Sequence, residues 1–189
     1  EGPQAGKLLW KAPEWATNVI APSPLAMPDG KIFLTAGYGA GSMIIQLKES
    51  NGIFSYDILQ QYKPVSGLAC EQQTPIFWKG KLFGVMPKDG GQNRNRFVCV
   101  DPSDCTKFLW TSEETRFGLG PFILADGKFY LLNDDGTLYI IEASTERFKI
   151  LDSKPIIADG HDAWAPIAIA DGYMLLRDAS TMVCISIGN

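Results

Sequence analysis

The stretch GPFILADGKFYLL, residues 120–132, decides the fold. Its proline leads into an almost fully apolar run, Asp126-Gly127 interrupts that run, and a lysine then opens a second apolar and aromatic run. Glycine readily adopts the positive φ that tight hairpin turns require. A fully apolar strand is typically covered on both faces. The stretch therefore predicts a buried strand, a tight turn and an antiparallel partner strand.

The same pattern occurs four times along the chain. In each copy a small residue and a proline precede an apolar run, a turn, and a second run that begins with a basic or aromatic residue. The four prolines are Pro24, Pro75, Pro121 and Pro166, so the pattern recurs every 45–51 residues. A repeat of this length, built from short strands, is typical of propeller blades of four strands each.

These repeats predict an all-β fold, a β-propeller of four-stranded antiparallel blades that occupies residues 1–189 as a single domain. In the third blade, alternating polar and apolar residues predict the outer strand over residues 147–151. The four blades are expected at about residues 22–58, 74–111, 120–151 and 165–187.

The two ends of the repeat array do not match each other. Residues 6–11 carry the outer-strand pattern before any blade has begun, whereas the fourth repeat stops after its third strand. We expect residues 6–11 to be the outer strand of the last blade or of a missing blade. Bare apolar flanks and open strand edges favour association. Either the strand around Leu8 and Trp10 pairs with that around Val183 and Ile185 within one chain, or two chains associate blade to blade.

Charge and hydropathy exclude two classes of function. The net charge is −4, from 17 basic and 21 acidic residues, and no block of like charge occurs, so we expect no nucleic-acid partner. The apolar runs are only a few residues long, far short of the roughly 20 that a membrane-spanning helix needs. With 46% hydrophobic residues, the chain can instead bury a sizeable core.

The four cysteines do not form a metal-binding pattern. Cys99 and Cys105 enclose a short turn, so they could close a hairpin by a disulfide, and two free buried thiols are the alternative. Cys70 and Cys184 are expected in the core, because a free cysteine behaves as a small buried hydrophobe.

Several motifs carry a resemblance to a known family. They are Gly-Lys-x-Leu-Trp at residues 6–10, the proline-led strands followed by Asp-Gly-Lys-aromatic, and Asp-Asp-Gly-Thr-Leu-Tyr at residues 134–139. These motifs resemble the pyrroloquinoline-quinone-like β-propeller repeat over about residues 6–187. The resemblance implies a periplasmic or otherwise extracytoplasmic location. Because relatives usually have six to eight blades, it also implies that these four blades are part of a larger propeller.

The same resemblance sets the expectation for cofactors. The family includes quinoprotein dehydrogenases as well as a non-enzymatic outer-membrane assembly lipoprotein. The dehydrogenases carry a vicinal cysteine pair beside the quinone and a calcium ion held by acidic and amide side chains. This chain contains no Cys-Cys dipeptide. We therefore expect no cofactor, neither pyrroloquinoline quinone nor calcium, and no other metal.

The residues that precede each repeat proline differ most between blades. There the chain crosses to the central axis of a propeller, and the position before the proline is always small. Because propeller ligands usually meet the loops at the channel mouth, the polar and aromatic residues at these positions form the candidate binding site. They are Glu71, Gln72, Gln73, Arg116, His161, Asp162 and Trp164.

Each candidate also has a purely structural interpretation. Glu71, Arg116 and Asp162 could form ion pairs between blades, His161 and Asp162 could form a solvated pair, and Trp164 could pack between blades.

Together these features favour a non-enzymatic, extracytoplasmic binding or scaffold propeller whose partner is an unidentified small molecule, saccharide or protein. The alternative is an enzyme whose site is completed by other blades. It would be part of a quinone-dependent dehydrogenase, or a carbohydrate-active propeller that uses Glu71 and Asp162 as paired carboxylates.

Overall fold

The computed structural model describes residues 5–188 and consists of antiparallel sheets with two short 3₁₀ turns. Each sheet is one blade, and its strands pair in the order in which they follow along the chain. The first blade comprises β1 (Leu25–Ala26), β2 (Lys31–Ala36), β3 (Gly41–Ser50) and β4 (Ile53–Tyr62). The second comprises β5 (Ile76–Trp78), β6 (Lys81–Val85), β7 (Phe97–Asp101) and β8 (Asp104–Thr111).

The third blade has four strands and the fourth blade has three. The third comprises β9 (Phe122–Ala125), β10 (Lys128–Leu132), β11 (Thr137–Glu142) and β12 (Ile150–Pro155). The fourth comprises β13 (Ala168–Ala170), β14 (Tyr173–Arg177) and β15 (Met182–Ser186). This confirms the prediction of an all-β propeller.

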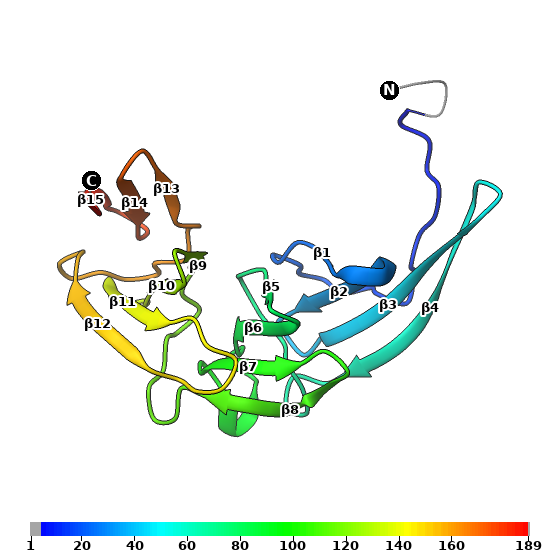
Figure 1. Cartoon of the computed structure of the whole chain (residues 1–189), viewed down its shortest axis with the longest axis horizontal. Helices are drawn as coiled ribbons and strands as arrows, with labels where there is room; N and C mark the ends of the chain where they lie inside the picture. Colours follow the sequence, from blue (N-terminus) through cyan, green and yellow to red (C-terminus); the bar gives the residue numbers. More distant parts are fainter. Residues whose placement is uncertain (1–4, 189) are drawn as a thin grey trace.

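The four blades stand side by side along an open arc (Figure 1). The first strand of each blade lies on the inner side of the arc and the last strand lies on the outer side. The first blade and the fourth blade form the two ends of the arc and do not meet. No helix among residues 5–188 is long and apolar enough to span a membrane.

The core consists mainly of the interfaces between blades. Side chains alternate across a strand, so the second blade sends Leu82 and Val98 toward the first blade but Phe83 and Phe97 toward the third. Phe83 and Phe97 lie 4.9 and 5.2 Å from the ring of Phe129 in the third blade. A separate apolar cluster joins the third blade to the fourth. Packing between neighbouring blades therefore holds the arc together.

The outer strand of the third blade differs from its prediction. It spans Ile150–Pro155 in place of residues 147–151. A bulge between Ile140 and Ile141 shifts the pairing. Phe148 leaves the sheet and packs against Trp110 of the second blade, with ring centroids 5.9 Å apart. The apolar residue that suggested a strand is thus a contact between blades.

Residues 7–12 contain no strand in this structure. They do not pair with β15, because the two ends of the arc lie apart (Figure 1). Trp10 instead packs against Tyr56 of β4, with ring centroids 5.8 Å apart. A role for this segment as the outer strand of a missing blade stays a prediction.

All four cysteines are free, so the disulfide alternative for Cys99 and Cys105 is wrong here. The two side chains point to opposite faces of the second blade, into different core clusters. Burial raises the pKa of each thiol to about 12. Cys70 is buried as predicted, but Cys184 is exposed, because it lies on the face of the fourth blade that has no neighbour in the chain.

Candidate functional site: a polar rim near the axis

Two kinds of segment form one rim of the arc. Lead-in segments connect the outer strand of one blade to the first strand of the next, at residues 63–75, 112–121 and 156–167. Rim loops connect the second strand of a blade to the third. Since the first two strands of a blade are antiparallel, the rim loop lies at the same edge as the lead-in segment.

The rim residues of the second and fourth blades touch directly. The side-chain amide Nε2 of Gln73 donates a hydrogen bond to the backbone oxygen of Trp164 at 2.7 Å, across 91 residues of sequence. Next to it, the backbone N–H of Ser23 donates to Oγ1 of Thr74 at 2.8 Å and ties the first blade to the second. The lead-in segments of the second and fourth blades and the residues just before β1 therefore converge on one place.

The indole of Trp164 lies at the centre of this rim. Its Nε1 donates to Oδ1 of Asp134 in the β10–β11 loop at 3.0 Å. The same oxygen accepts the backbone N–H of Leu119, also at 3.0 Å. Nζ of Lys88, in the β6–β7 loop, lies 5.5 Å from the centroid of the indole ring. Trp164 thus contacts groups from the second and third blades.

The carboxyl group of Asp134 has a raised pKa. Partial burial raises its pKa above the ordinary value, and the negative charge of Asp162 adds to this effect. The two N–H donors and the positive charge of Lys88 act in the opposite direction. A proton is therefore bound more readily here than at an exposed aspartate.

Glu71 lies beneath the rim and is only 6% exposed. Its carboxylate accepts the backbone N–H of Lys88 at 3.3 Å. A Cβ atom at Gly37 would collide with the Glu71 side chain, so the rim loop of the first blade fits closely over it. Gln72, its neighbour, is half-buried. Glu71 therefore connects two rim loops through a backbone hydrogen bond, and not through the ion pair between blades that the structural interpretation expected.

Arg116 and His161 have local partners. The exposed guanidinium of Arg116 donates to the backbone oxygens of Gln92 and Arg94 in the β6–β7 loop. Nδ1 of His161 lies 3.5 Å from Oδ2 of Asp162, and both side chains are more than half exposed. Arg116 thus holds a rim loop in place, while His161 and Asp162 extend from the rim into solvent.

The structure adds Lys88 and Asp134 to the residues named from the sequence. Both belong to rim loops, whereas the repeat analysis covered only the lead-in segments. Asp134 lies between Asn133 and Asp135, two residues before Gly136, so its sequence context is that of an ordinary turn residue. A comparison of the four rim loops, at residues 37–40, 86–96, 133–136 and 178–181, would have revealed their differences in length and charge.

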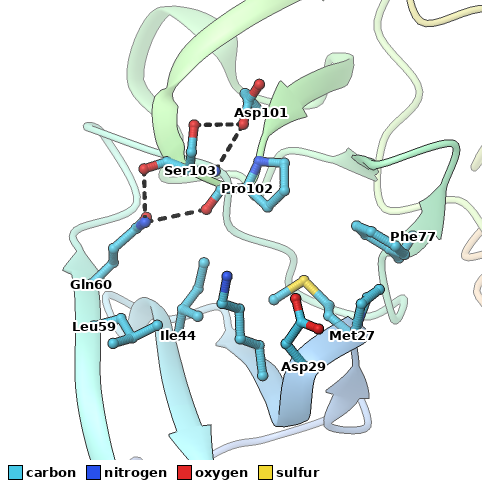
Figure 2. Close-up of a pocket in the computed structure, with 11 residues that line it drawn as sticks. Met27, Asp29, Ile44, Leu59, Gln60, Phe77, Asp101, Pro102 and Ser103 are labelled. Atoms are coloured by element: carbon cyan, nitrogen blue, oxygen red, sulfur yellow. Dashed lines mark hydrogen bonds between the residues drawn. The ribbon is translucent and has the colours of Figure 1, made fainter.

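A hollow lies at the opposite edge of the sheets, between the first and second blades (Figure 2). It has a volume of about 240 Å³. Nε2 of Gln60 donates to the backbone oxygens of Pro102 and Ser103 at 3.2 and 2.8 Å. Nζ of Lys81 lies 2.5 Å from Oδ2 of Asp101 within the second blade. This contact, together with the hydrogen bonds from Ser103, holds the pKa of the Asp101 carboxyl well below its usual range. Gln60 thus links the two blades, but the hollow draws its groups from two blades where the rim draws them from three, so it is the weaker candidate.

The rim contains the means for binding: an indole face, an amide, an ammonium, carboxylates and one imidazole. Within residues 5–188, no group of three or more His, Cys, Asp or Glu side chains is placed to hold a metal ion. Fold and rim together define the class of protein, a β-propeller with a polar axial rim.

Comparisons with known proteins agree on the fold. No protein-family model matches the sequence, and no curated protein matches it. AztD from Citrobacter koseri, a propeller, is 20% identical over 88% of this chain, with a TM-score of 0.51. BamB from Moraxella catarrhalis, also a propeller, is 9% identical over 87% of the chain, with a TM-score of 0.55.

The chain spans 43% of the length of AztD and of BamB. A third similar structure, the computationally designed Ika4 protein, is 13% identical, with a TM-score of 0.54, and 96% of its length is covered. At these identities the similarity shows a shared propeller fold.

Proposed function

We propose that this chain is a non-enzymatic binding or scaffold propeller that works outside the cytoplasm and holds its ligand at the polar rim. The observation that supports this most strongly is the contact network of Gln73, Lys88, Asp134 and Trp164. It joins three blades at one place and presents several kinds of binding group. The extracytoplasmic location follows from the resemblance to pyrroloquinoline-quinone-like repeats.

The chemistry of the rim suits a saccharide. Sugar rings offer an apolar face that stacks on an indole and hydroxyl groups that pair with carboxylates and amides. Trp164 is half-buried, and Lys88, which lies over its ring, is exposed and can move aside. Asp134, Gln73 and the exposed pair His161 and Asp162 supply the polar partners.

Glycoside hydrolysis by Glu71 and Asp162 fits the geometry less well. Such enzymes need two carboxyl groups that flank one scissile bond. Glu71 is buried beneath the rim loops, whereas Asp162 is exposed. A binding role needs no access to Glu71.

The test is saturation-transfer NMR with a panel of neutral and acidic disaccharides. At least one member should receive saturation from the wild-type protein, and Trp164→Ala should weaken its binding by about 2 kcal/mol or more, as for a central tryptophan anchor. Tyr38→Ala is the matched control, because Tyr38 is an exposed aromatic residue on another rim loop. The proposal of a saccharide at the rim is wrong if no member binds, or if Trp164→Ala binds as well as wild type.

A further inference from the structure

The fourth blade is incomplete in two respects. Within residues 5–188 it has three strands where the other blades have four, so the outer edge of β15 is unpaired in this part of the chain. One of its faces also has no neighbour, and this face is largely apolar. Tyr173, Leu175 and Met182 are 55%, 43% and 65% exposed on it, beside the free thiol of Cys184. Such a face is typical of one that packs against another blade.

Residues 7–10 have the sequence of the strand that this blade lacks. They read Lys-Leu-Leu-Trp, and residues 107–110 in the outer strand β8 of the second blade read Lys-Phe-Leu-Trp. Residues 7–10 nevertheless belong to no sheet, and Leu8 is 74% exposed. One chain thus carries an unfilled strand position and, at the other end of its arc, an irregular segment that has the sequence of an outer strand (Figure 1).

The contact made by Trp10 shows where that strand belongs. Trp110 packs against Phe148 of the next blade, with centroids 5.9 Å apart and planes at 42°. Trp10 packs against Tyr56 of the first blade at 5.8 Å and 50°. The two contacts are nearly the same. Trp10 therefore occupies the position of an outer-strand tryptophan in a blade that precedes the first.

We propose that, for the chain of residues 1–189, a second copy supplies that preceding blade. Its strands β13–β15 would pair with residues 7–11 of the first copy, and the reciprocal pairing would occur at the other end. Both surfaces lie on one chain at opposite ends of an open arc, so two copies related by a two-fold axis close a ring. That ring has eight blades, within the range known for propellers.

The register follows from the second blade. There Cys99 lies opposite Trp110, and Val98 lies opposite Thr111. In the fourth blade Cys184 pairs with Leu175 as Cys99 pairs with Phe83. Trp10 of one copy is therefore expected opposite Cys184 of the other, and Lys11 opposite Val183.

The first test is the mass in solution by light scattering. We expect twice the chain mass of 20.7 kDa. Leu8→Asp should weaken the dimer by about tenfold or more, because it buries a charge in the interface. Its fold should persist by circular dichroism, since Leu8 is exposed within the chain. Val65→Asp, at another exposed apolar residue, should leave the dimer intact. A monomer, or a dimer that tolerates Leu8→Asp, would overturn the proposal.

The second test is a cross-link in the full chain. The triple variant Lys11→Cys, Val183→Cys, Cys184→Ser should form a disulfide-linked dimer under mild oxidation. Neither Lys11→Cys nor Val183→Cys alone, in the Cys184→Ser background, should do so. The remaining native thiols are buried and have raised pKa values, so they should not compete. Cross-linking within one chain, or none, would contradict a second copy. Both tests are independent of the ligand proposed for the rim.

Discussion

At the scale of single residues, Asp134 links the third and fourth blades. One of its oxygens accepts both the Leu119 N–H and the Trp164 indole N–H. Gly118 has a positive φ, and a Cβ atom there would collide with the carboxylate. The sequence shows Asp134 only as a turn residue, because its two partners come from segments that lie 15 and 30 residues away. This role could not be predicted from local pattern.

Substitutions at Asp134 should separate hydrogen bonding from charge. Asp134→Ala leaves two partly buried donors without an acceptor and should lower the free energy of unfolding by about 2 kcal/mol. Asp134→Asn retains an acceptor oxygen and should cost much less. Urea denaturation at pH 7 measures both. Equal losses in the two variants would show that the hydrogen bonds contribute little.

Wild type and Asp134→Asn should also differ in how their stability depends on pH, and the sign of this difference can be predicted. The folded state raises the pKa of Asp134, so the ionised carboxylate destabilises the fold at neutral pH. That cost should disappear as the pH falls through the raised pKa toward the ordinary value of 3.8. The stability of wild type relative to Asp134→Asn should therefore increase between pH 7 and pH 4. The other acidic groups are the same in both proteins, so their effects cancel when the two free energies of unfolding are subtracted. If wild type instead became less stable relative to Asp134→Asn as the pH falls, the burial of the Asp134 carboxyl group would be contradicted.

At the scale of elements, the inner strands could be predicted from the sequence where they are buried on both faces, because such strands read as apolar runs. The runs after Pro75 and Pro121 and the turns at Gly80 and Gly127 lie where the repeat placed them. The outer strands are less predictable, since alternation there can reflect contacts outside the sheet. Phe148 illustrates this, because it packs on Trp110 from a loop.

The outer-strand tryptophans provide a test at this scale. Trp110 is 8% exposed, contacts several aromatic rings and donates Nε1–H to the backbone oxygen of Ser144 at 3.0 Å. Trp110→Ala should lower the free energy of unfolding by about 3–5 kcal/mol. With both variants made in the Leu8→Asp background, which weakens the proposed dimer, Trp10→Ala should cost clearly less, because Trp10 is half-buried in the single chain, where it packs against Tyr56 at the end of the arc. Chemical denaturation at matched protein concentration compares them. A larger loss for Trp10 would contradict this assignment of the blade contacts.

At the scale of the whole molecule, the number of blades could be predicted from the repeat, but the open arc could not. The number of repeats gives the number of blades, because each repeat forms one blade. The curvature depends on the aromatic packing between blades, as with Phe83, Phe97 and Phe129. The rim could be predicted only in part, because contacts between blades are not visible in the repeat pattern. Lead-in segments were identifiable because they vary between copies, but their meeting with rim loops depends on how blades are placed around the axis.

The central claim is that separate blades meet at a polar rim, and one measurement tests it most directly. Gln73 and Trp164 are 91 residues apart in sequence and on different blades, yet they share a hydrogen bond. NOE spectroscopy on isotope-labelled protein should show cross-peaks from the Gln73 side-chain amide protons to backbone protons of Trp164 and Ala165. If these cross-peaks are absent and the Gln73 amide has the chemical shifts of a free side chain, the blades do not meet there and the proposed rim does not exist.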